Sequence, residues 1–568
     1  MPTNAVKQTD ESFKFLLGNE AIVQGALEAG VSFAAGYPGT PSSEIIERLA
    51  ERARDLNLYV EWSTNEKVAT EGAAAAAFSG LRSMAAMKNA GLSVALDFLT
   101  HLSLTGLGDL GGALVVAVCD DPDAHSSGDE TDSRWIAKFA YTPLLEPSSV
   151  SEAREMVRSA FDLSERHKCS VMLRSYTRLS HGSSLVELAE IEKSDRRAHS
   201  ETDACITPYL AKPKHDLTLR RLDRIREEFE QWPFNEYHGP EKPRLVIVAS
   251  GSGVQCALEA IELLGLEESV GLLKLTTLWP FPKQFVQEHL KGVREVLVVE
   301  EVDPFVESHV KETLFDGDES GQNVWGRQSG HIPDFGEINP DRVLAALSEI
   351  LGIEFKSRSA SYGKRVEEAV DKLLISRGLT WCAGCPHRAS FWSLNKAIKG
   401  AKIDAYVTGD IGCYTLDVFP EGKCQMNLLH AMGSSLGLAA GLGQLGRFGH
   451  QQPIVSICGD STFFHSAIPA LINAVYNNSN LVHIVLDNEA TAMTGFQAHP
   501  GVGYNAMGDP AKRVDIEKLC AALDVPVETI DPFDIKAAIR TMRDLIKREE
   551  GVRVLTMKRA CDLLRMKR

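Results

Sequence analysis

CGDSTFFHSAIPALINAVYNNSNLVHIVLDNEATAMTG, residues 458–495, is the stretch that decides the fold of the C-terminal part of the chain. Asp460 and Ser461 follow an apolar run, an amphipathic segment comes next, and a second apolar run leads up to Asn488. This order predicts a strand, a turn, a helix, a second strand and a second loop. An Asp and an Asn that follow two neighbouring parallel strands can hold one octahedral Mg²⁺, with a backbone carbonyl and diphosphate oxygens in other positions.

Thiamine diphosphate enzymes use this arrangement, in which a Gly-Asp-Gly triplet is followed, one helix and one strand later, by Asn. In this sequence Ser461 stands in place of the second glycine. An ordinary βαβ unit of a buried sheet would give the same pattern without any cofactor. The motif by itself therefore leaves both interpretations open.

Composition narrows the function class. The chain has 568 residues, 44% of them hydrophobic and 24% charged, as in a large soluble globular protein. The net charge of -17, without a basic cluster, argues against nucleic-acid binding. The N-terminus lacks the apolar core of a signal peptide, and the apolar runs are of strand length, so we expect a cytoplasmic protein with no membrane segment. The 11 cysteines then suit buried thiols or metal ligands better than disulfides.

Short apolar runs alternate with helical patterns along the chain, which predicts parallel sheets covered on both faces. The first such stretch occupies residues 1–204, and a charged segment at 205–243 is expected to form an exposed helix and a link. A second α/β unit is expected at 244–353, a connecting helix at 354–375, and a third unit at 376–568. The predicted fold class is therefore α/β, with three doubly wound domains.

Two motifs in the first unit follow predicted strands and open helices. In GYPGTPSSE, residues 36–44, Thr40 is the predicted N-cap and Pro41 the first helical residue. The free amides there can hold a carboxylate, although a capped helix without a ligand gives the same pattern. Further on, Asn65 is placed to cap a small-residue helix with Glu66 in its first turn. Glu66 can bond the N1′ atom of an aminopyrimidine or merely complement the helix dipole.

A dense polar loop, residues 125–134, follows another predicted strand, and Lys88 ends a further one. Parallel-sheet proteins bind their ligands at the carboxyl ends of strands. His125 and Lys88 are therefore candidate ligand contacts, and a plain surface position is the alternative for each.

The cysteines of the last unit suggest an inorganic site. Cys382 and Cys385 form a CxxC pair, and Cys413 ends the first strand of this unit. Such a pair can bind zinc, form a redox dithiol or hold an iron–sulfur cluster. A [4Fe–4S] cluster would need a fourth thiolate, for which Cys561 and Cys424 are the candidates, and a pair of structural thiols is the alternative.

Taken together, the motifs resemble the large, thiamine-binding subunit of indolepyruvate:ferredoxin oxidoreductase, in the pyruvate:ferredoxin oxidoreductase superfamily. The resemblance covers nearly the whole chain and rests on AAGYPGTPSSEI, NEKVATEGAAAAAFSG, MKNAGLSVALD, DDPDAHSSGDETDSR, VVEEVDPFVE, WCAGCPHR, GDIGCYTL and the 458–495 stretch. It implies a pyrimidine-binding domain, a transketolase C-terminal-like middle domain and a diphosphate-binding domain, in that order. It also implies oxidative decarboxylation of 2-oxoacids, namely arylpyruvates such as indolepyruvate, to acyl-CoA.

The resemblance assigns roles by position. Glu66 matches the glutamate that activates thiamine diphosphate, and Thr40 matches the contact to the substrate carboxylate. The implied Mg²⁺ ligands are Asp460, Asn488 and the carbonyl of Ala490. The implied [4Fe–4S] ligands are Cys382, Cys385, Cys413 and, by its place after the final strand, Cys561. The expected catalytic residues are Glu66, Thr40 and His125, and the expected cofactor contacts are Gly39, Glu66, Asp410, Gly459, Asp460, Ser461 and Asn488.

The sequence lacks the CxxCxxCxxxCP runs of the two-cluster ferredoxin domain that usually ends indolepyruvate enzymes. We therefore expect electrons to leave one cluster through ferredoxin or a separate electron-transfer subunit. The resemblance implies a smaller gamma-like partner subunit, coenzyme A as co-substrate, and a dimer of this chain. The alanine-rich helix at 71–77 is expected to offer a flat packing surface for that dimer.

Other function classes stay open. A non-oxidative thiamine-dependent 2-oxoacid decarboxylase would need no cluster, so bound iron and acid-labile sulfide distinguish it. A zinc-stabilised nucleotide-binding protein would hold zinc at Cys382 and Cys385. A regulatory paralogue would keep the fold and bind neither cofactor.

Overall fold

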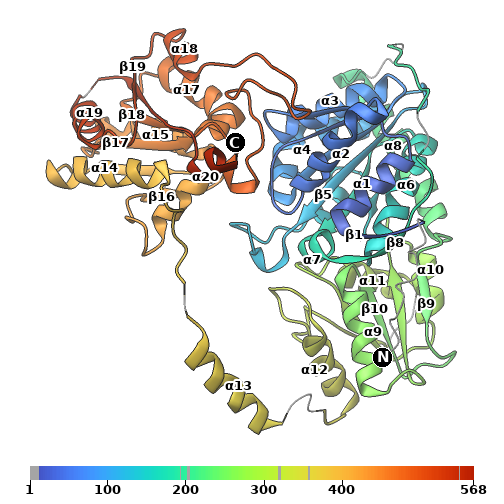
Figure 1. Ribbon diagram of the computed structural model, residues 1–568. Coiled ribbons are helices and arrows are strands. Elements are labelled where there is room, and N and C mark those ends of the chain that lie inside the picture. The colour runs from blue at the N-terminus through green and yellow to red at the C-terminus, as the bar shows by residue number, and fades with distance from the viewer. Residues whose placement is uncertain are drawn as a thin grey trace, which may run out of the picture. The chain divides into compact units, whose positions relative to one another are not determined.

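A computed structural model describes residues 12–191, 194–200, 205–317, 321–355, 359–375, 377–548 and 550–567 (Figure 1). The chain divides into two compact units, Met1–Ser359 and Ala360–Arg568. The described part of the first unit contains a seven-stranded, a five-stranded and a two-stranded sheet, and that of the second contains a six-stranded sheet.

The seven-stranded sheet has the order β12-β6-β7-β5-β4-β2-β3. Its strands are β2 (Phe33–Gly36), β3 (Tyr59–Trp62), β4 (Arg82–Lys88), β5 (Ala113–Asp120), β6 (Leu144–Leu145), β7 (Val171–Tyr176) and β12 (Thr277–Trp279). All neighbours are parallel except β12, which runs antiparallel to β6. Every residue of β5 is buried, as expected for a central strand covered on both faces.

Helices connect these strands. They are α1 (Gly18–Glu28), α2 (Ser43–Leu56), α3 (Glu66–Phe78), α4 (Asn89–Thr105), α5 (Ser133–Phe139), α6 (Val150–His167) and α7 (Thr177–His181), with a 3₁₀ turn at Pro122–Ala124. A small antiparallel sheet pairs β1 (Phe13–Leu17) with β8 (Ser183–Glu187).

The alanine-rich helix packs mainly against its own chain. Ala73, Ala74, Ala76 and Ala77 of α3 are buried within this chain, and the exposed alanine of the run is Ala75. The small side chains let α3 approach α4 and β4 closely, and the Ser83 hydroxyl donates to the Ala73 carbonyl at 2.7 Å. Most of these alanines therefore pack within the chain, and a dimer contact through this helix stays a prediction.

The five-stranded sheet has the order β14-β13-β10-β11-β9. Its strands are β9 (Glu236–His238), β10 (Leu245–Ser250), β11 (Val270–Leu275), β13 (Glu295–Val299) and β14 (Asn323–Trp325). Its helices are α9 (Ser252–Leu264), α10 (Lys283–Leu290), α11 (Phe305–Asp316) and α12 (Pro340–Leu351). One apolar cluster joins this sheet to the first, because it contains Met87 and Leu99 together with Val248 and Phe305.

The charged segment at 205–243 is integrated into the first unit. Helix α8 (Pro208–Phe229) buries one face, on which Leu222, Ile225 and Phe229 recur at helical spacing. The hydroxyl of Thr218 donates to the Ser103 carbonyl of α4 at 3.1 Å, and β9 extends the five-stranded sheet. The predicted helix is thus present and mostly exposed, with one buried face, and the bounds of the linker stay a prediction.

The second unit begins with α13 (Ala360–Leu373), the predicted connecting helix, none of whose described side chains is buried. The six-stranded sheet has the order β16-β15-β17-β18-β20-β19, with all neighbours parallel. Its strands are β15 (Tyr406–Gly409), β16 (Leu428–Leu429), β17 (Ile454–Gly459), β18 (Leu481–Asp487), β19 (Val527–Ile530) and β20 (Val552–Lys558). The remaining helices are α14 (Pro386–Gly400), α15 (Ser434–Leu442), α16 (Asp460–Thr462), α17 (Ile468–Tyr476), α18 (Ile516–Ala521), α19 (Ile535–Lys547) and α20 (Asp562–Lys567). Short turns lie at Cys413–Val418, Leu445–Phe448 and Ala492–Thr494, and a π-helical turn at Phe463–Ala467.

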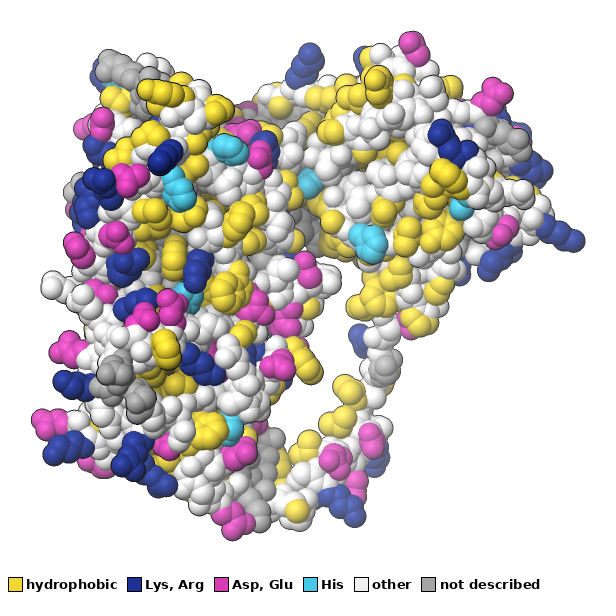
Figure 2. Space-filling view, turned by 180° about the vertical axis from the view of Figure 1, so that it is seen from behind, with side chains coloured by type: hydrophobic (Ala, Val, Ile, Leu, Met, Phe, Trp, Pro, Cys, Tyr) yellow, Lys and Arg dark blue, Asp and Glu magenta, His cyan; other side chains and the backbone are white. Residues whose placement is uncertain are grey.

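The α/β class with parallel-rich sheets is thus confirmed, whereas the exact domain boundaries stay predictions. Among the described helices, none is both long and apolar enough to cross a membrane. Over the face shown in Figure 2, acidic and basic side chains are interspersed.

Candidate active site

Oxygen atoms from three residues meet where β17 and β18 end. One end of the Asn488 amide lies 3.2 and 3.3 Å from Asp460 Oδ1 and Oδ2 and 2.8 Å from the Ala490 carbonyl oxygen. The other end of the amide lies 3.2 Å from His387 Nε2. The backbone N–H of Asn488 also donates to Asp460 Oδ2 at 3.1 Å. The two strands thus place the predicted Mg²⁺ ligands together, because β17 and β18 are adjacent and parallel.

These spacings suit a cation. With the amide oxygen of Asn488 turned toward Asp460 and Ala490, it faces only acceptors. Two adjacent ligands of an octahedral Mg²⁺, each about 2.0–2.1 Å from the ion, lie about 2.9 Å apart. The observed separations of 2.8 to 3.3 Å are close to this value, so the residues fit a magnesium ion. Without an ion, the Asn488 amide nitrogen could turn toward the Asp460 and Ala490 oxygens and donate hydrogen bonds to them.

The charge state of Asp460 also suits a metal ligand. Burial raises the pKa of Asp460, but His499 and the Ser461 backbone N–H more than compensate, so the net shift is downward. His499 Nε2 lies 3.2 Å from Asp460 Oδ2, and the Ser461 N–H donates to Oδ1 at 2.8 Å. Burial and the nearby charge of Asp460 raise the pKa of Asp487 to about 6. Of this pair, Asp460 is therefore the carboxylate that stays ionised to lower pH.

Asp410 organises the same end of the sheet. It is buried, and its oxygens accept from Ser435 Oγ at 2.6 Å and from the Tyr414 hydroxyl. Burial raises the pKa of Asp410 to about 7. Tyr414 packs so closely that a Cβ on Gly459 would lie 3.0 Å from its ring. These contacts fix the start of α15, whereas a direct contact from Asp410 to the cofactor stays a prediction.

The N-terminus of α15 is a further candidate contact that the sequence reasoning missed. Gly433 precedes the helix with a φ of +78°, and a Cβ there would collide with Ser466 Oγ. The Ser466 hydroxyl donates to the Met432 carbonyl at 3.1 Å, which joins this turn to the segment after Asp460. Backbone amides at a helix N-terminus can hold a diphosphate.

The predicted cluster cysteines gather in the second unit. Burial, followed by the charges of Cys385, Cys561 and Cys382, raises the pKa of Cys413 to about 12. Gly384 abuts Asp562, because a Cβ on Gly384 would lie 2.7 Å from its carboxylate, so the CxxC turn lies beside Cys561. Cys385 is the N-cap of α14.

The Cys424 Sγ contacts the carbonyls of Val418 and Phe419 at 3.8 and 3.4 Å, and Cys424 is not among the thiols that act most on Cys413. Within the described residues, no three His, Cys, Asp or Glu side chains are already arranged as a metal site. The thiols are therefore near one another without ligand geometry, and cluster binding stays a prediction.

In the first unit, three motifs converge at the carboxyl ends of β2, β4 and β5. The Ser126 hydroxyl donates to the Thr40 carbonyl at 3.2 Å, and Lys88 Nζ donates to the Ser126 carbonyl at 2.9 Å. A Cβ on Gly39 would lie 2.9 Å from Lys88 Cβ. Burial lowers the pKa of Lys88 despite the nearby charges of Asp121 and Asp129. This corner of the sheet, formed by Thr40, Lys88 and Ser126, can present the Thr40 hydroxyl and the Lys88 ammonium group to a carboxylate.

Two details differ from the sequence interpretation. The N-cap of α2 is Ser42 and not Thr40, because the helix begins at Ser43 and the Ser42 hydroxyl donates back to the Gly39 carbonyl at 2.7 Å. The His125 side chain is 47% exposed, and its Nε2 lies 3.7 Å from Glu337 Oε2. His125 therefore lies on the rim of this corner, and its catalytic role stays a prediction.

Glu66 occupies the expected place. It is the first residue of α3, only 7% exposed, and Asn65 caps the helix by accepting from the Val68 N–H at 3.0 Å. A Cβ on Gly91 would collide with the Glu66 carboxylate, so glycine at this position leaves room for that side chain. Glu66 follows β3, which neighbours β2, so it lies at the same edge of the sheet as Thr40.

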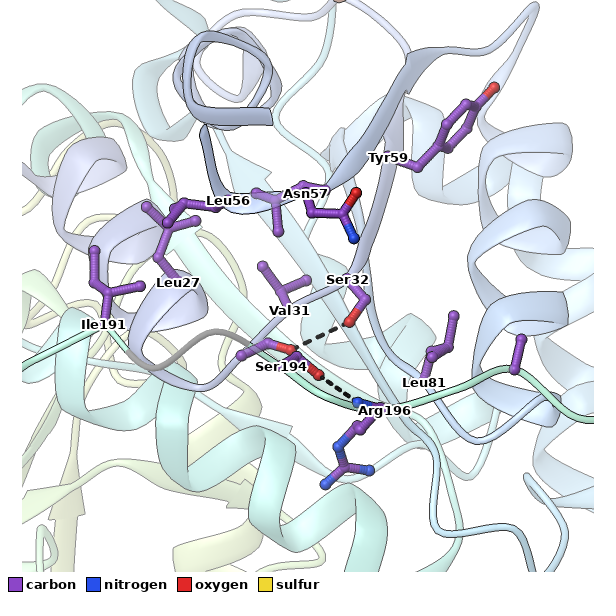
Figure 3. A pocket seen from close by; sticks show the side chains of 13 residues that line it. Leu27, Val31, Ser32, Leu56, Asn57, Tyr59, Leu81, Ile191, Ser194 and Arg196 are labelled. Atoms are coloured by element: carbon purple, nitrogen blue, oxygen red, sulfur yellow. Dashed lines mark hydrogen bonds between the residues drawn. The ribbon is translucent and has the colours of Figure 1, made fainter. Parts of the chain in front are cut away.

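A cavity of about 370 Å³ lies at the other end of this sheet. It is lined by residues that precede β2, β3 and β4, namely Val31, Ser32, Leu58 and Leu81, and by the segment around Arg196 (Figure 3). Because Thr40, Glu66 and Lys88 follow the opposite ends of these strands, this cavity is not part of the candidate site.

Comparisons with known families agree with this layout. Residues 24–231 match the thiamine diphosphate-binding domain of pyruvate flavodoxin/ferredoxin oxidoreductases. Residues 235–373 match the indolepyruvate oxidoreductase domain. Residues 410–556 match the C-terminal TPP-binding domain of thiamine pyrophosphate enzymes.

Full-length relatives decide the family. The chain is 41% identical to indolepyruvate oxidoreductase subunit IorA of Pyrococcus horikoshii, over 97% of this chain and 86% of that protein. The chain belongs to the indolepyruvate oxidoreductase IorA family. It is also 38% identical to IorA of Archaeoglobus fulgidus, over 99% of this chain and 89% of that protein. A solved 2-oxoglutarate:ferredoxin oxidoreductase from Magnetococcus marinus aligns over 60% of this chain and 65% of that chain, at 14% identity and a TM-score of 0.46.

Membership of the IorA family confirms the resemblance seen in the sequence, and the domain matches support thiamine diphosphate binding at both ends of the chain. The sequence reasoning missed His387 and His499, which contact the two side-chain ligands of the candidate Mg²⁺ site. Burial lowers the pKa of His387 to about 4, so this ring is neutral. The sequence signal that could have indicated His387 is its position two residues after Cys385 of the CxxC pair.

Proposed function

We propose that this chain is the thiamine diphosphate-dependent subunit of an enzyme that oxidatively decarboxylates arylpyruvates such as indolepyruvate. Family membership supports 2-oxoacid oxidoreduction in general. The observation that carries the finer proposal is the group of oxygens from Asp460, Asn488 and Ala490, whose spacing suits octahedral Mg²⁺. These residues would hold the ion, and the N-terminus of α15 would face the diphosphate.

Thiamine diphosphate, when bound, supplies the carbon nucleophile and the electron sink for decarboxylation. Glu66 would hold a proton between its carboxylate and the N1′ nitrogen of the aminopyrimidine. Its burial restricts the carboxylate, and the absence of a Cβ at Gly91 leaves room for it. Thr40 and Lys88 would hold the substrate carboxylate, because a hydroxyl and a buried ammonium are suitable partners for it. His125, at the rim of this group, would contact the substrate.

We further propose that Cys382, Cys385, Cys413 and Cys561 hold one [4Fe–4S] cluster. Their mutual electrostatic influence and the contact between Gly384 and Asp562 support this set over one that contains Cys424. A cluster held by these thiolates would supply one-electron transfer toward ferredoxin or a separate electron-transfer subunit. Coenzyme A would take the acyl group.

The proposed enzyme works with partners. We expect a dimer of this chain together with a smaller gamma-like subunit, and a cytoplasmic location. Purified alone, the chain should decarboxylate poorly and fail to reduce ferredoxin. Full oxidative turnover by the isolated chain would contradict the partner requirement.

Chemical analysis and turnover test the proposal. The anaerobically purified chain, supplied with Mg²⁺ and thiamine diphosphate, should bind the cofactor and contain iron and acid-labile sulfide in equal amounts. Together with its partner it should release CO₂ from indolepyruvate only when an electron acceptor is present. CO₂ release without iron or an acceptor would instead favour a non-oxidative decarboxylase. Zinc in place of iron would exclude the oxidative reaction.

A further inference from the structure

His387 is a buried side chain outside the proposed ligand sets that contacts one of the proposed Mg²⁺ ligands. It lies in the first turn of α14, and its Nε2 is 3.2 Å from the Asn488 side-chain nitrogen. His387 is only 5% exposed. Its ring stands edge-on to the ring of Tyr414, with ring centroids 6.1 Å apart and planes at 88°. The position of the ring nitrogen is therefore fixed by packing.

The Asn488 amide has two orientations that differ by exchange of its oxygen and nitrogen. One orientation turns the oxygen toward Asp460 and Ala490, which a cation requires, and points the nitrogen at His387 Nε2. The other turns the nitrogen inward, where it donates to those oxygens, and needs a proton on His387 Nε2. Whether His387 Nε2 carries a proton thus determines which atom of Asn488 faces the cation site.

Resting on the proposed function, we propose that His387 is a positioning residue that turns the Asn488 amide oxygen toward the cation. It does so by accepting a hydrogen bond from Asn488 Nδ2 through an unprotonated Nε2. Partners that orient metal ligands in this way contribute substantially to metal affinity. Because His387 is two residues from Cys385, the same helical turn would also join the proposed cluster to the proposed Mg²⁺ site.

The test measures Mn²⁺ affinity, by the loss of the free-ion signal in electron paramagnetic resonance. It uses the full-length chain with thiamine diphosphate. His387→Phe keeps a planar ring but has no acceptor, and we expect it to weaken Mn²⁺ binding by about 10- to 100-fold. His387→Gln offers an acceptor oxygen and should stay near the wild-type affinity. His450→Phe, a matched change on a ring that packs against Tyr406, should leave the affinity unchanged.

Repeating the measurement in an Asn488→Asp variant separates an effect on amide orientation from a general loss of structure. In Asn488→Asp both side-chain atoms are oxygens, so no orientation remains to be selected, and adding His387→Phe should then have little further effect. An equal loss of affinity in both backgrounds, or no loss in either, would overturn the role of His387. If the wild-type chain binds no Mn²⁺ with thiamine diphosphate, the proposed function fails as well, and this outcome is distinguishable from the other two.

Discussion

The backbone N–H of Cys561 donates a 2.9 Å hydrogen bond to the carbonyl oxygen of Asn488. The last proposed cluster ligand and a proposed Mg²⁺ ligand are therefore bonded neighbours, although the segment from 489 to 560 separates them in the sequence. This contact exists because β18 and β20 are adjacent and parallel, so that the residues following them meet. Both candidate inorganic sites thus lie at one edge of one sheet.

The fourth cluster ligand can be tested by exchange of single cysteines. Cys561→Ser should lower the iron and acid-labile sulfide content and remove the visible absorbance of the cluster, because serine is a poor ligand for iron–sulfur iron. Cys424→Ser should keep both, since the Cys424 thiol contacts the backbone carbonyls of Val418 and Phe419. Loss of iron and sulfide in Cys424→Ser but not in Cys561→Ser would instead make Cys424 the fourth ligand. The measurement is iron and sulfide analysis of anaerobically purified protein.

Glu66→Gln should retain thiamine diphosphate binding but lose decarboxylation by about 10²- to 10⁴-fold, the usual contribution of general acid–base catalysis. The carboxylate is replaced by an isosteric amide that cannot exchange a proton with the cofactor. Cofactor affinity by calorimetry and CO₂ release from indolepyruvate check the two parts. Unchanged turnover would leave Glu66 with only its interaction with the helix dipole.

Gly91→Ala should also lower the rate of decarboxylation, although Gly91 carries no reacting group. The added methyl would collide with the Glu66 carboxylate and displace it. We expect reduced turnover at nearly unchanged thermal stability. Gly363→Ala, whose Cβ would meet nothing within 4 Å, is the matched control. Wild-type turnover in Gly91→Ala would show that the position of Glu66 is not critical.

Lys88→Met should raise KM for the 2-oxoacid by about 10- to 100-fold, as expected for loss of a charged hydrogen bond of 1.5–3 kcal/mol. The methionine fills similar volume but cannot attract a carboxylate. The control is Lys67→Met, because Lys67 pairs with exposed Asp97 at 3.0 Å on the surface. A fall in kcat with KM unchanged would instead place Lys88 outside substrate binding. Steady-state kinetics with the complete enzyme distinguish these results.

The stability of the chain should fall as the pH drops below 6.5. Burial lowers the pKa of His483 to about 3 from its ordinary value of 6.5, so the unfolded chain binds the proton first. This contribution is fully present above pH 6.5 and is progressively lost toward pH 3. At pH 5 the loss amounts to about 2 kcal/mol. His483→Gln removes the titrating group, so its thermal midpoint should fall less between pH 7 and pH 5. An identical fall in both proteins would contradict this assignment.

The sequence predicted the parts of the site that follow strand order. Asp460 and Asn488 come directly after buried apolar runs, and the carboxyl ends of neighbouring parallel strands meet at one edge. The cap formed by Asn65 and the place of Glu66 were equally local, and both are confirmed. Such features depend on residues that are close in the chain.

The features that the sequence could not predict depend on distant contacts. His499 reaches Asp460 only because the loop after β18 folds back, and no periodic pattern marks that loop. The buried face of α8 was hidden by its many charged side chains. Thr40 and Ser42 are both good capping residues, so only the path of the backbone decides that the helix starts after Ser42.

The most direct test of the account is a crystal structure of the chain with thiamine diphosphate and Mn²⁺, in which anomalous scattering locates the metal. The account predicts a single peak about 2.1 Å from Asp460, the Asn488 side-chain oxygen and the Ala490 carbonyl oxygen, with octahedral geometry completed by diphosphate oxygens and water. A metal peak away from these three residues, or a cofactor bound without them, would contradict it.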